Sequence, residues 1–304
     1  MKASPLSGAP GASAVAALPA RLADVIQLGK PRITTLVLIS TALGFALGGN
    51  GPFPWGRFAA LMAGTALVAW GINAINQYME RDTDALMPRT ANRPLPAGRL
   101  TPGPVLAGGA AGTLAGLATL AWGTNGLAFW IALTVVVTYV AIYTPLKRVS
   151  ALNTLVGAFP GALPAPLGWA AASGSLGQEA LALFGIMFVW QLPHFLPIAW
   201  LYRHDYTKAG LVMITVNDPS GGATRRQQLL YTATLVLISL YPSVIGMAGT
   251  TYFVGALILG GGFFAAAVAM SLHLTDERAR MVLKVSVLYL PLLLGLLAYD
   301  ATPL

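Results

Sequence analysis

Cysteine is absent from the 304 residues, and charged residues make up only 9% of them. Without cysteine there can be no disulfide, no thiolate nucleophile and no cysteine-ligated metal, which excludes iron–sulfur clusters and c-type haem attachment. A soluble domain is about 25% charged and about 45–50% apolar, whereas this chain is 56% hydrophobic. The composition therefore predicts an integral membrane protein.

Long apolar runs recur along the chain, and none shows the short, strictly alternating segments of an outer-membrane barrel. Several runs reach the roughly 17–25 residues that a helix needs to cross a bilayer. The fold class that they predict is an all-α polytopic membrane protein with its helices bundled around a central cavity. We place nine transmembrane helices at about 33–49, 57–78, 104–122, 126–144, 152–172, 180–202, 228–247, 252–272 and 281–298.

The net charge of +8 comes from basic residues scattered among the predicted loops, which argues against a nucleic-acid partner. If the N-terminus is cytoplasmic, every Lys and Arg except Arg57 lies in or beside a cytoplasmic segment. This distribution is the expected one, because Lys and Arg are retained on the cytoplasmic side of the membrane. This bias predicts a multi-pass protein of a bacterial-type cytoplasmic (inner) membrane. Its N-terminus would be inside, its C-terminus outside, and the lipid bilayer would surround it.

The chain begins with a segment rich in Ala, Ser, Gly and Pro that lacks the charged start and apolar core of a signal peptide. We expect residues 1–22 to form a disordered cytoplasmic tail and residues 23–304 to form one transmembrane domain. Two long cytoplasmic connections, about 79–103 and 203–227, lie four helices apart, which suggests two four-helix halves and a ninth helix. Because long loops in compact bundles are often functional, we expect the active site to face the cytoplasm.

Asn76, Glu80 and Asp84 stand four residues apart at the end of an apolar run. On a helix each four-residue step turns the side chain by only about 40°, so the three share one face. Acids near lipid usually face a functional cavity, and oxygen ligands suit Mg²⁺, which commonly bridges carboxylates to a diphosphate. The triplet therefore predicts a catalytic magnesium site. The alternative is a solvated helix end whose acids pair with nearby arginines.

Basic residues near this triplet could bind the same diphosphate. Arg89 and Arg93 follow the acids, and guanidinium groups bind phosphate oxygens in pairs. Lys147 and Arg148 end the motif YTPLKR at 143–148 and could close over the diphosphate from the opposite side, with Lys147 taking part in catalysis. Ordinary cytoplasmic-side residues would look the same, so that alternative stays open.

The sixth predicted span contains two polar residues, Gln191 and His194, three positions apart and near one helix face. We expect both to line the cavity. His194 has three candidate roles: a ligand of haem iron, an acid or base, or a hydrogen-bond partner of a neighbouring helix.

The stretch NQYMERDTDALMPRTANRPLPAG, residues 76–98, resembles the first signature of the UbiA-type intramembrane prenyltransferases. Within that superfamily, other fragments are similar to the haem-prenylating branch, the protoheme IX farnesyltransferases or haem O synthases. The resemblance extends from about residue 24 to the end, and the order and spacing of the fragments are specific. These fragments are LGKPRITTLVL at 28–38, YTPLKR at 143–148, WQLPHF at 190–195 and DYTKAG at 205–210.

The resemblance implies a UbiA-type fold and an Mg²⁺-dependent enzyme. It implies transfer of the farnesyl group of farnesyl diphosphate to a vinyl group of haem B (protohaem IX) with addition of water. The products would be diphosphate and haem O for haem-copper terminal oxidases, so a haem A synthase or an oxidase-assembly protein is the partner it suggests. It also implies a catalytic role for Asp205 and acceptor contacts from Gln191, His194, Tyr202 and Tyr206.

Two positions depart from the wider pattern. Glu80 stands where the family usually has Asp, which keeps the charge and adds one methylene. A second acidic pair usually follows the sixth helix, whereas here Tyr202 and Tyr206 stand at those positions with only Asp205 nearby, so a second metal site is open. A hydroxybenzoate or naphthoate acceptor is the nearest rival, since it would favour that second pair. A transporter is disfavoured because the acids lie at the membrane edge instead of the midplane.

Overall fold

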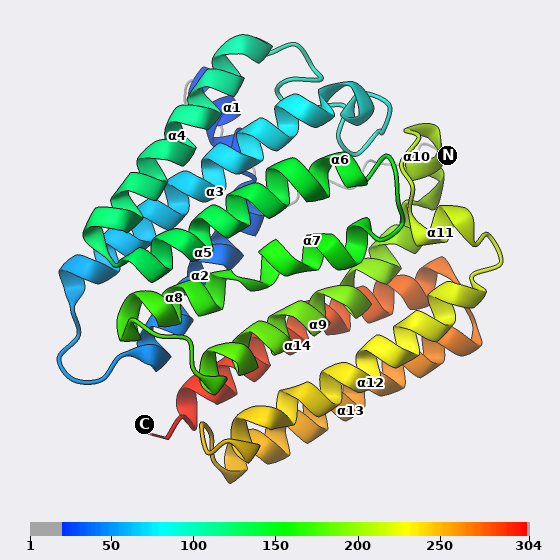
Figure 1. Cartoon of the computed structure of the whole chain (residues 1–304). Helices are drawn as coiled ribbons and strands as arrows, with labels where there is room; N and C mark the ends of the chain where they lie inside the picture. The colour runs from blue at the N-terminus through cyan, green and yellow to red at the C-terminus, as the bar shows by residue number, and fades with distance from the viewer. Residues whose placement is uncertain (1–19, 303–304) are drawn as a thin grey trace, which may run out of the picture.

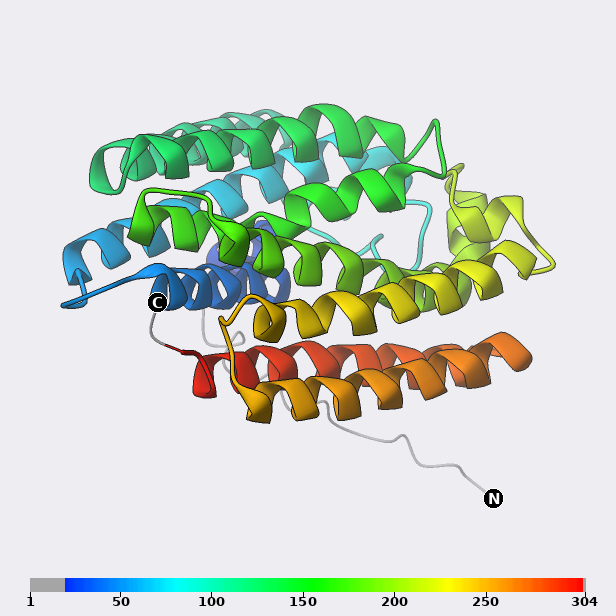
Figure 2. The same ribbon diagram turned by 60° about the horizontal axis from the view of Figure 1, so that its bottom comes forward.

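The computed structural model describes residues 20–302, which form an all-helical bundle apart from one isolated bridge between Ala248 and Ala301. The long helices lie side by side in a single bundle (Figure 1, Figure 2). These are α2 (Pro31–Gly48), α3 (Trp55–Asp84), α4 (Pro102–Gly123), α5 (Gly126–Val136), α9 (Gln178–Leu201), α12 (Gly222–Val244), α13 (Thr250–Leu272) and α14 (Asp276–Tyr299). The shorter helices are α1 (Ala20–Leu28), η1 (Val137–Tyr143), α6 (Thr144–Leu146), α7 (Asn153–Ala162), α8 (Pro164–Ser173), α10 (Arg203–Lys208) and α11 (Ile214–Asn217).

Eight of the nine predicted spans coincide with helical segments that are long and apolar enough to cross a membrane. The other span is α12, which has 23 residues but begins with a polar turn that includes Arg225 and Arg226. This helix packs along α9 and α13 and runs beside the other long helices (Figure 2). The all-α membrane fold is therefore confirmed.

Three predicted boundaries differ from the structure. Residues 20–22, assigned to a disordered tail, belong to α1, while residues 1–19 of that tail lie outside the described residues. Helix α3 continues to Asp84, beyond the membrane span placed at 57–78, as the four-residue spacing of Asn76, Glu80 and Asp84 requires. The connection predicted at 203–227 contains α10, α11 and the start of α12.

Two spans beside the cavity are interrupted. Proline lacks an amide donor and its ring clashes with the preceding turn, and Pro164 accordingly begins α8 directly after the break at Leu163. Helix α5 passes into η1, a seven-residue π-helix that the sequence does not predict. Such π-helical segments are frequent at functional sites, and this one carries Tyr139 and Tyr143 into cavity walls.

Glycine allows α2 and α8 to pack in backbone contact. A Cβ on Gly44 would collide with the carbonyl oxygen of Ala165, and a Cβ on Gly168 would collide with that of Thr41. Larger residues at either position would push the two helices apart. This contact holds α2 against the bundle and thereby positions the cavity residues that α2 carries.

Candidate active site

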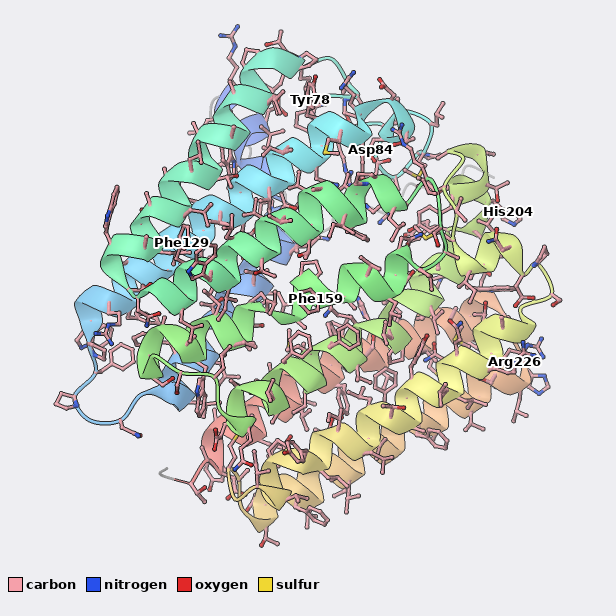
Figure 3. All side chains as sticks on the ribbon, in the orientation of Figure 1. Tyr78, Asp84, Phe129, Phe159, His204 and Arg226 are labelled. Atoms are coloured by element: carbon pink, nitrogen blue, oxygen red, sulfur yellow. The ribbon has the colours of Figure 1, made fainter. Side chains whose placement is uncertain are left out.

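Polar side chains gather at one end of the bundle, where Tyr78, Asp84, His204 and Arg226 lie, whereas Phe129 lies toward the other end (Figure 3). A cavity of about 480 Å³ reaches into the bundle from Glu80 and Asp84. A second, largely apolar cavity of about 260 Å³ adjoins it. The side chains that line both cavities include Lys30, Tyr143, Lys147, Gln191 and Phe195.

Glu80 and Asp84 line the larger cavity one helical turn apart, and each accepts a hydrogen bond from a cation. Lys147 Nζ lies 2.6 Å from Glu80 Oε1, and Arg93 Nη1 lies 2.5 Å from Asp84 Oδ2. The two carboxylate side chains are only 13% and 3% exposed. The alternative of a solvated helix end is therefore wrong for this pair, although Asp84 does pair with a loop arginine.

Asn76 lies further along the same face of α3 and is fully buried. Its Oδ1 accepts a hydrogen bond from Lys30 Nζ at 2.7 Å, and its Nδ2 donates to Thr144 Oγ1 at 3.0 Å. The amide oxygen and the amide nitrogen are thus both hydrogen-bonded within the protein, and Asn76 does not line the larger cavity. The structure therefore binds Asn76 to Lys30 and does not bring it into the cavity wall with Glu80 and Asp84.

Lys30 is a site residue that we did not single out from the sequence. Its ammonium group contacts only neutral groups, namely Asn76 Oδ1 and, at 3.3 Å, Tyr139 Oη. Burial, reinforced by the positive charge of Arg93, lowers the pKa of Lys30 to about 7. Its φ of 49° is the only positive value outside glycine among residues 20–302, and such strain is characteristic of functional sites. Among residues 20–302, no carboxylate forms an ion pair with the Lys30 ammonium group.

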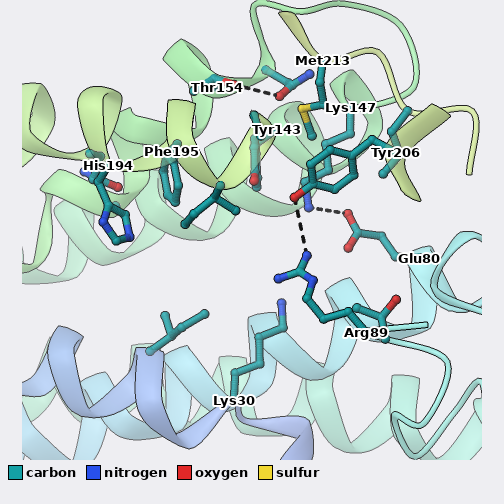
Figure 4. A pocket seen from close by; sticks show the side chains of 18 of the residues that line it. Lys30, Glu80, Arg89, Tyr143, Lys147, Thr154, His194, Phe195, Tyr206 and Met213 are labelled. Carbon is teal, nitrogen blue, oxygen red and sulfur yellow. Dashed lines mark hydrogen bonds and ion pairs between the residues drawn. The ribbon is translucent and has the colours of Figure 1, made fainter. Parts of the chain in front are cut away.

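Some of the other predicted polar residues line the larger cavity and the rest do not. Arg89 lines the larger cavity, donates to Tyr206 Oη at 3.5 Å and lies over the Tyr202 ring at 4.7 Å (Figure 4). Tyr206 lines the cavity as well, whereas Tyr202 and Asp205 do not. Arg148 is exposed, lies outside both cavities and donates only to the carbonyl oxygen of Met79, at 3.5 Å.

The far end of the larger cavity carries two of the four predicted acceptor residues, Gln191 and His194, whereas Tyr202 and Tyr206 contact Arg89 near the acids. His194 lies well apart from Glu80 in Figure 4. Its ring stacks on Trp190 with centroids 4.7 Å apart, and Phe195 lies beside it. Gln191 is buried and donates to the carbonyl oxygens of Ala158 and Met187, so only part of its side chain faces the cavities.

Comparison with known proteins agrees with this arrangement of acids, cations and apolar walls. Residues 37–290 match the UbiA prenyltransferase family. The chain belongs to the UbiA prenyltransferase family. It is 45% identical over 286 residues to the protoheme IX farnesyltransferase of Solibacter usitatus, covering 91% of this chain and 98% of the relative. It is 41% identical over 293 residues to that of Koribacter versatilis, covering 92% and 94%.

Solved structures share the fold. A digeranylgeranylglyceryl phosphate synthase superposes with a TM-score of 0.78 at 16% identity, covering 92% of this chain and 98% of that protein. A UbiA homolog from Archaeoglobus fulgidus bound to GPP and Mg²⁺ gives 0.63 at 17% identity, covering 90% and 99%. The UbiA-type fold predicted from the sequence is thereby confirmed.

The donor set of this UbiA protein fits one Mg²⁺ ion. Among residues 20–302, no three His, Asp or Glu side chains lie close enough together to hold a metal by themselves. Magnesium does not require such a group, since it is usually bound through one or two carboxylates together with substrate phosphates and water. Glu80 and Asp84 supply two carboxylates on one face of α3, directed at the cavity and surrounded by cations.

Sequence reasoning missed Lys30 because it precedes a membrane helix, where a basic residue normally marks topology. The motif LGKPRITTLVL contains this lysine but does not indicate that its side chain points into the cavity. It also missed Ser286 of α14, which bonds His194 at 2.7 Å. A lone serine in an apolar helix carries no signal in the sequence, because its partner lies 92 positions away.

Proposed function

We propose that this chain is a protoheme IX farnesyltransferase, which joins the farnesyl group of farnesyl diphosphate to a vinyl group of haem B and releases haem O and diphosphate. One observation carries this proposal. A single cavity has paired acids and cations at one end and His194 among aromatic rings at the other. The first end suits a metal-bound diphosphate, and the second suits a large, flat, iron-containing acceptor.

The diphosphate end contains more positive than negative charge. Lys30, Lys147, Arg89 and Arg93 line the larger cavity with the two carboxylates. Mg²⁺ held by Glu80 and Asp84 would stabilise the negative charge that grows on the diphosphate when it leaves. The four cations would bind the remaining phosphate oxygens, and preorganised charges of this kind are worth most in a site that excludes water. Asn76 would contribute by holding Lys30 or, once Lys30 has turned to the diphosphate, as a metal ligand.

We assign the two substrates to the two cavities. The smaller cavity is bounded on one side by Thr65, Val68, Ala69, Ile72 and Asn73, which follow one face of α3 for about 12 Å. Its mostly apolar lining and smaller volume suit an isoprenoid chain, whereas the larger cavity suits the tetrapyrrole. Both cavities meet beside Lys30 and Lys147, so the first carbon of the prenyl chain and the edge of the haem would meet there.

The bond changes balance without a nucleophilic side chain. The C–O bond of farnesyl diphosphate breaks, and its electron pair leaves with the diphosphate. The π electrons of the haem vinyl group form the new carbon–carbon bond. Water then adds to the remaining cationic carbon and releases a proton, which leaves the hydroxyethylfarnesyl group of haem O. The apolar walls near Phe195 and Tyr143 would keep water from the allylic cation until the carbon–carbon bond has formed.

Orientation and partners belong to the same proposal. Because basic residues gather at the end that carries Asp84, we place that end on the cytoplasmic side of an inner membrane. Product haem O would then pass to a haem A synthase or an oxidase-assembly protein.

The test is to incubate the purified protein in nanodiscs with haem B, farnesyl diphosphate and Mg²⁺ and to search for haem O by mass spectrometry. Asp84→Ala should abolish turnover and leave haem binding largely intact. Asp82→Ala is the matched control, since that exposed carboxylate lies two residues away and pairs only with Arg81. Prenylation of a hydroxybenzoate or naphthoate without any haem product would contradict the proposal, as would near-normal turnover by Asp84→Ala.

A further inference from the structure

Ser286 of α14 connects the haem end of the cavity to the last helix of the bundle. Its hydroxyl is fully buried, donates to the carbonyl oxygen of Leu283 at 2.7 Å and lies 2.7 Å from His194 Nδ1. Its own carbonyl oxygen accepts a hydrogen bond from Trp190 Nε1 at 2.8 Å. One residue therefore fixes both members of the Trp190–His194 stack.

This hydrogen-bond chain determines which nitrogen of His194 carries the proton. A serine hydroxyl has a single hydrogen, and the Leu283 carbonyl oxygen, 2.7 Å away, can only accept, so both contacts of Ser286 are hydrogen bonds only when that hydrogen is given to Leu283. The hydroxyl oxygen must then accept from His194, so Nδ1 carries the hydrogen and Nε2 is left with a free lone pair. Nε2 makes no hydrogen bond to any residue between 20 and 302, and the ring lines the larger cavity.

A lone pair on Nε2 also limits what His194 can bind. An unprotonated nitrogen cannot donate a hydrogen bond to a haem propionate, because both groups are acceptors. It can coordinate iron, and histidines that ligate metals almost always donate their other N–H to an oxygen that fixes the ring. Two of the three roles left open for His194 are thus combined, since the hydrogen bond to a neighbouring helix prepares the ring as an iron ligand, and no acid or base role is needed.

We propose that Ser286 is a positioning residue for the haem: it holds His194 as the Nδ1–H tautomer so that Nε2 binds the haem iron. This inference rests on the proposed function, because it takes haem B as the occupant of the larger cavity. His194, Lys30 and Lys147 line the same cavity, so a haem held by His194 would share that cavity with the diphosphate end.

The test is a titration of the protein in nanodiscs with ferric haem B in the absence of farnesyl diphosphate, followed by absorption and electron paramagnetic resonance spectra. The wild-type protein should show a histidine-ligated haem, and His194→Ala should lose that signature. Ser286→Ala should weaken haem binding by about 10- to 100-fold and disturb the ligation signature. Ser286→Thr keeps the hydroxyl and should restore both.

Ser239→Ala is the matched control, because Ser239 is a fully buried serine that hydrogen-bonds Tyr289 Oη of the same helix, α14, at 2.7 Å and lines neither cavity. It should change neither affinity nor spectrum. Wild-type-like spectra and affinity in Ser286→Ala would overturn the inference, and so would an unchanged signature in His194→Ala or the absence of haem binding by the wild type. Histidine-ligated haem without any haem O formation would instead contradict the proposed function alone.

Discussion

Replacing Leu120 with alanine should allow the protein to use a prenyl donor one isoprene unit longer than farnesyl diphosphate. Leu120 is fully buried in the wall of the smaller cavity. It packs so closely against Gly64 that a Cβ added at that glycine would collide with the leucine side chain. Its neighbour in that wall, Thr65, is the lining residue of α3 farthest from Glu80, about 22 Å away along the helix. Leu120 therefore lies at the end of the cavity that the tail of the chain would reach.

The size of the effect follows from packing. A fourth isoprene unit would have to be forced against this end wall, and overpacking typically costs about 1–3 kcal/mol. That corresponds to a preference of about 5- to 150-fold for farnesyl over geranylgeranyl diphosphate in the wild type. Leu120→Ala removes three carbon atoms from the wall and should cancel most of this preference. The protein itself should lose about 2–5 kcal/mol of stability, since a buried leucine is truncated.

The assay supplies both donors at equal concentration with haem B and measures the two haem products by mass spectrometry, whose ratio equals the ratio of kcat/KM. Leu117→Ala is the matched control, because Leu117 is buried on the same helix but does not line the cavity. It should destabilise the protein and leave the product ratio unchanged. An active Leu120→Ala protein with the wild-type ratio would refute the assignment of this cavity to the prenyl chain.

Three further predictions concern the diphosphate end. Lys147→Met should lower the free energy of unfolding by about 3 kcal/mol because it leaves the largely enclosed carboxylate of Glu80, 13% exposed, without its partner, and thermal unfolding should show recovery when Glu80→Gln is added. Lys30→Met should weaken binding of farnesyl diphosphate in equilibrium titrations, whereas Lys30→Arg should retain most of the affinity; equal loss in both variants would mean that shape, not charge, matters there. Removal of Mg²⁺ with a chelator should stop haem O formation and leave haem binding unchanged, and added Mg²⁺ should restore turnover.

The membrane fold could be predicted because long apolar runs leave few alternatives in lipid, and the acids of α3 could be predicted because their spacing and chemistry are local properties. The interruptions of the helices were only partly predictable. Proline at 164 signals its own break, whereas the π-helix η1 has no local sequence signal, because tertiary packing decides whether a helix widens. Ser286 and Lys30 depend on contacts across the bundle, so their roles appear only when the helices are assembled.

The contacts of Lys147 and Arg93 imply that the two ligands of the diphosphate end assist each other. In the substrate-free protein these cations are engaged by Glu80 and Asp84, which stabilises four partly or fully buried charges as two pairs. The same nitrogen atoms cannot fully serve the carboxylates and the phosphate oxygens at once. A metal ion on the carboxylates would release the cations for the diphosphate, and a diphosphate would draw them away from the carboxylates. Each ligand should therefore raise the affinity for the other by the same factor, because coupling between binding sites is reciprocal.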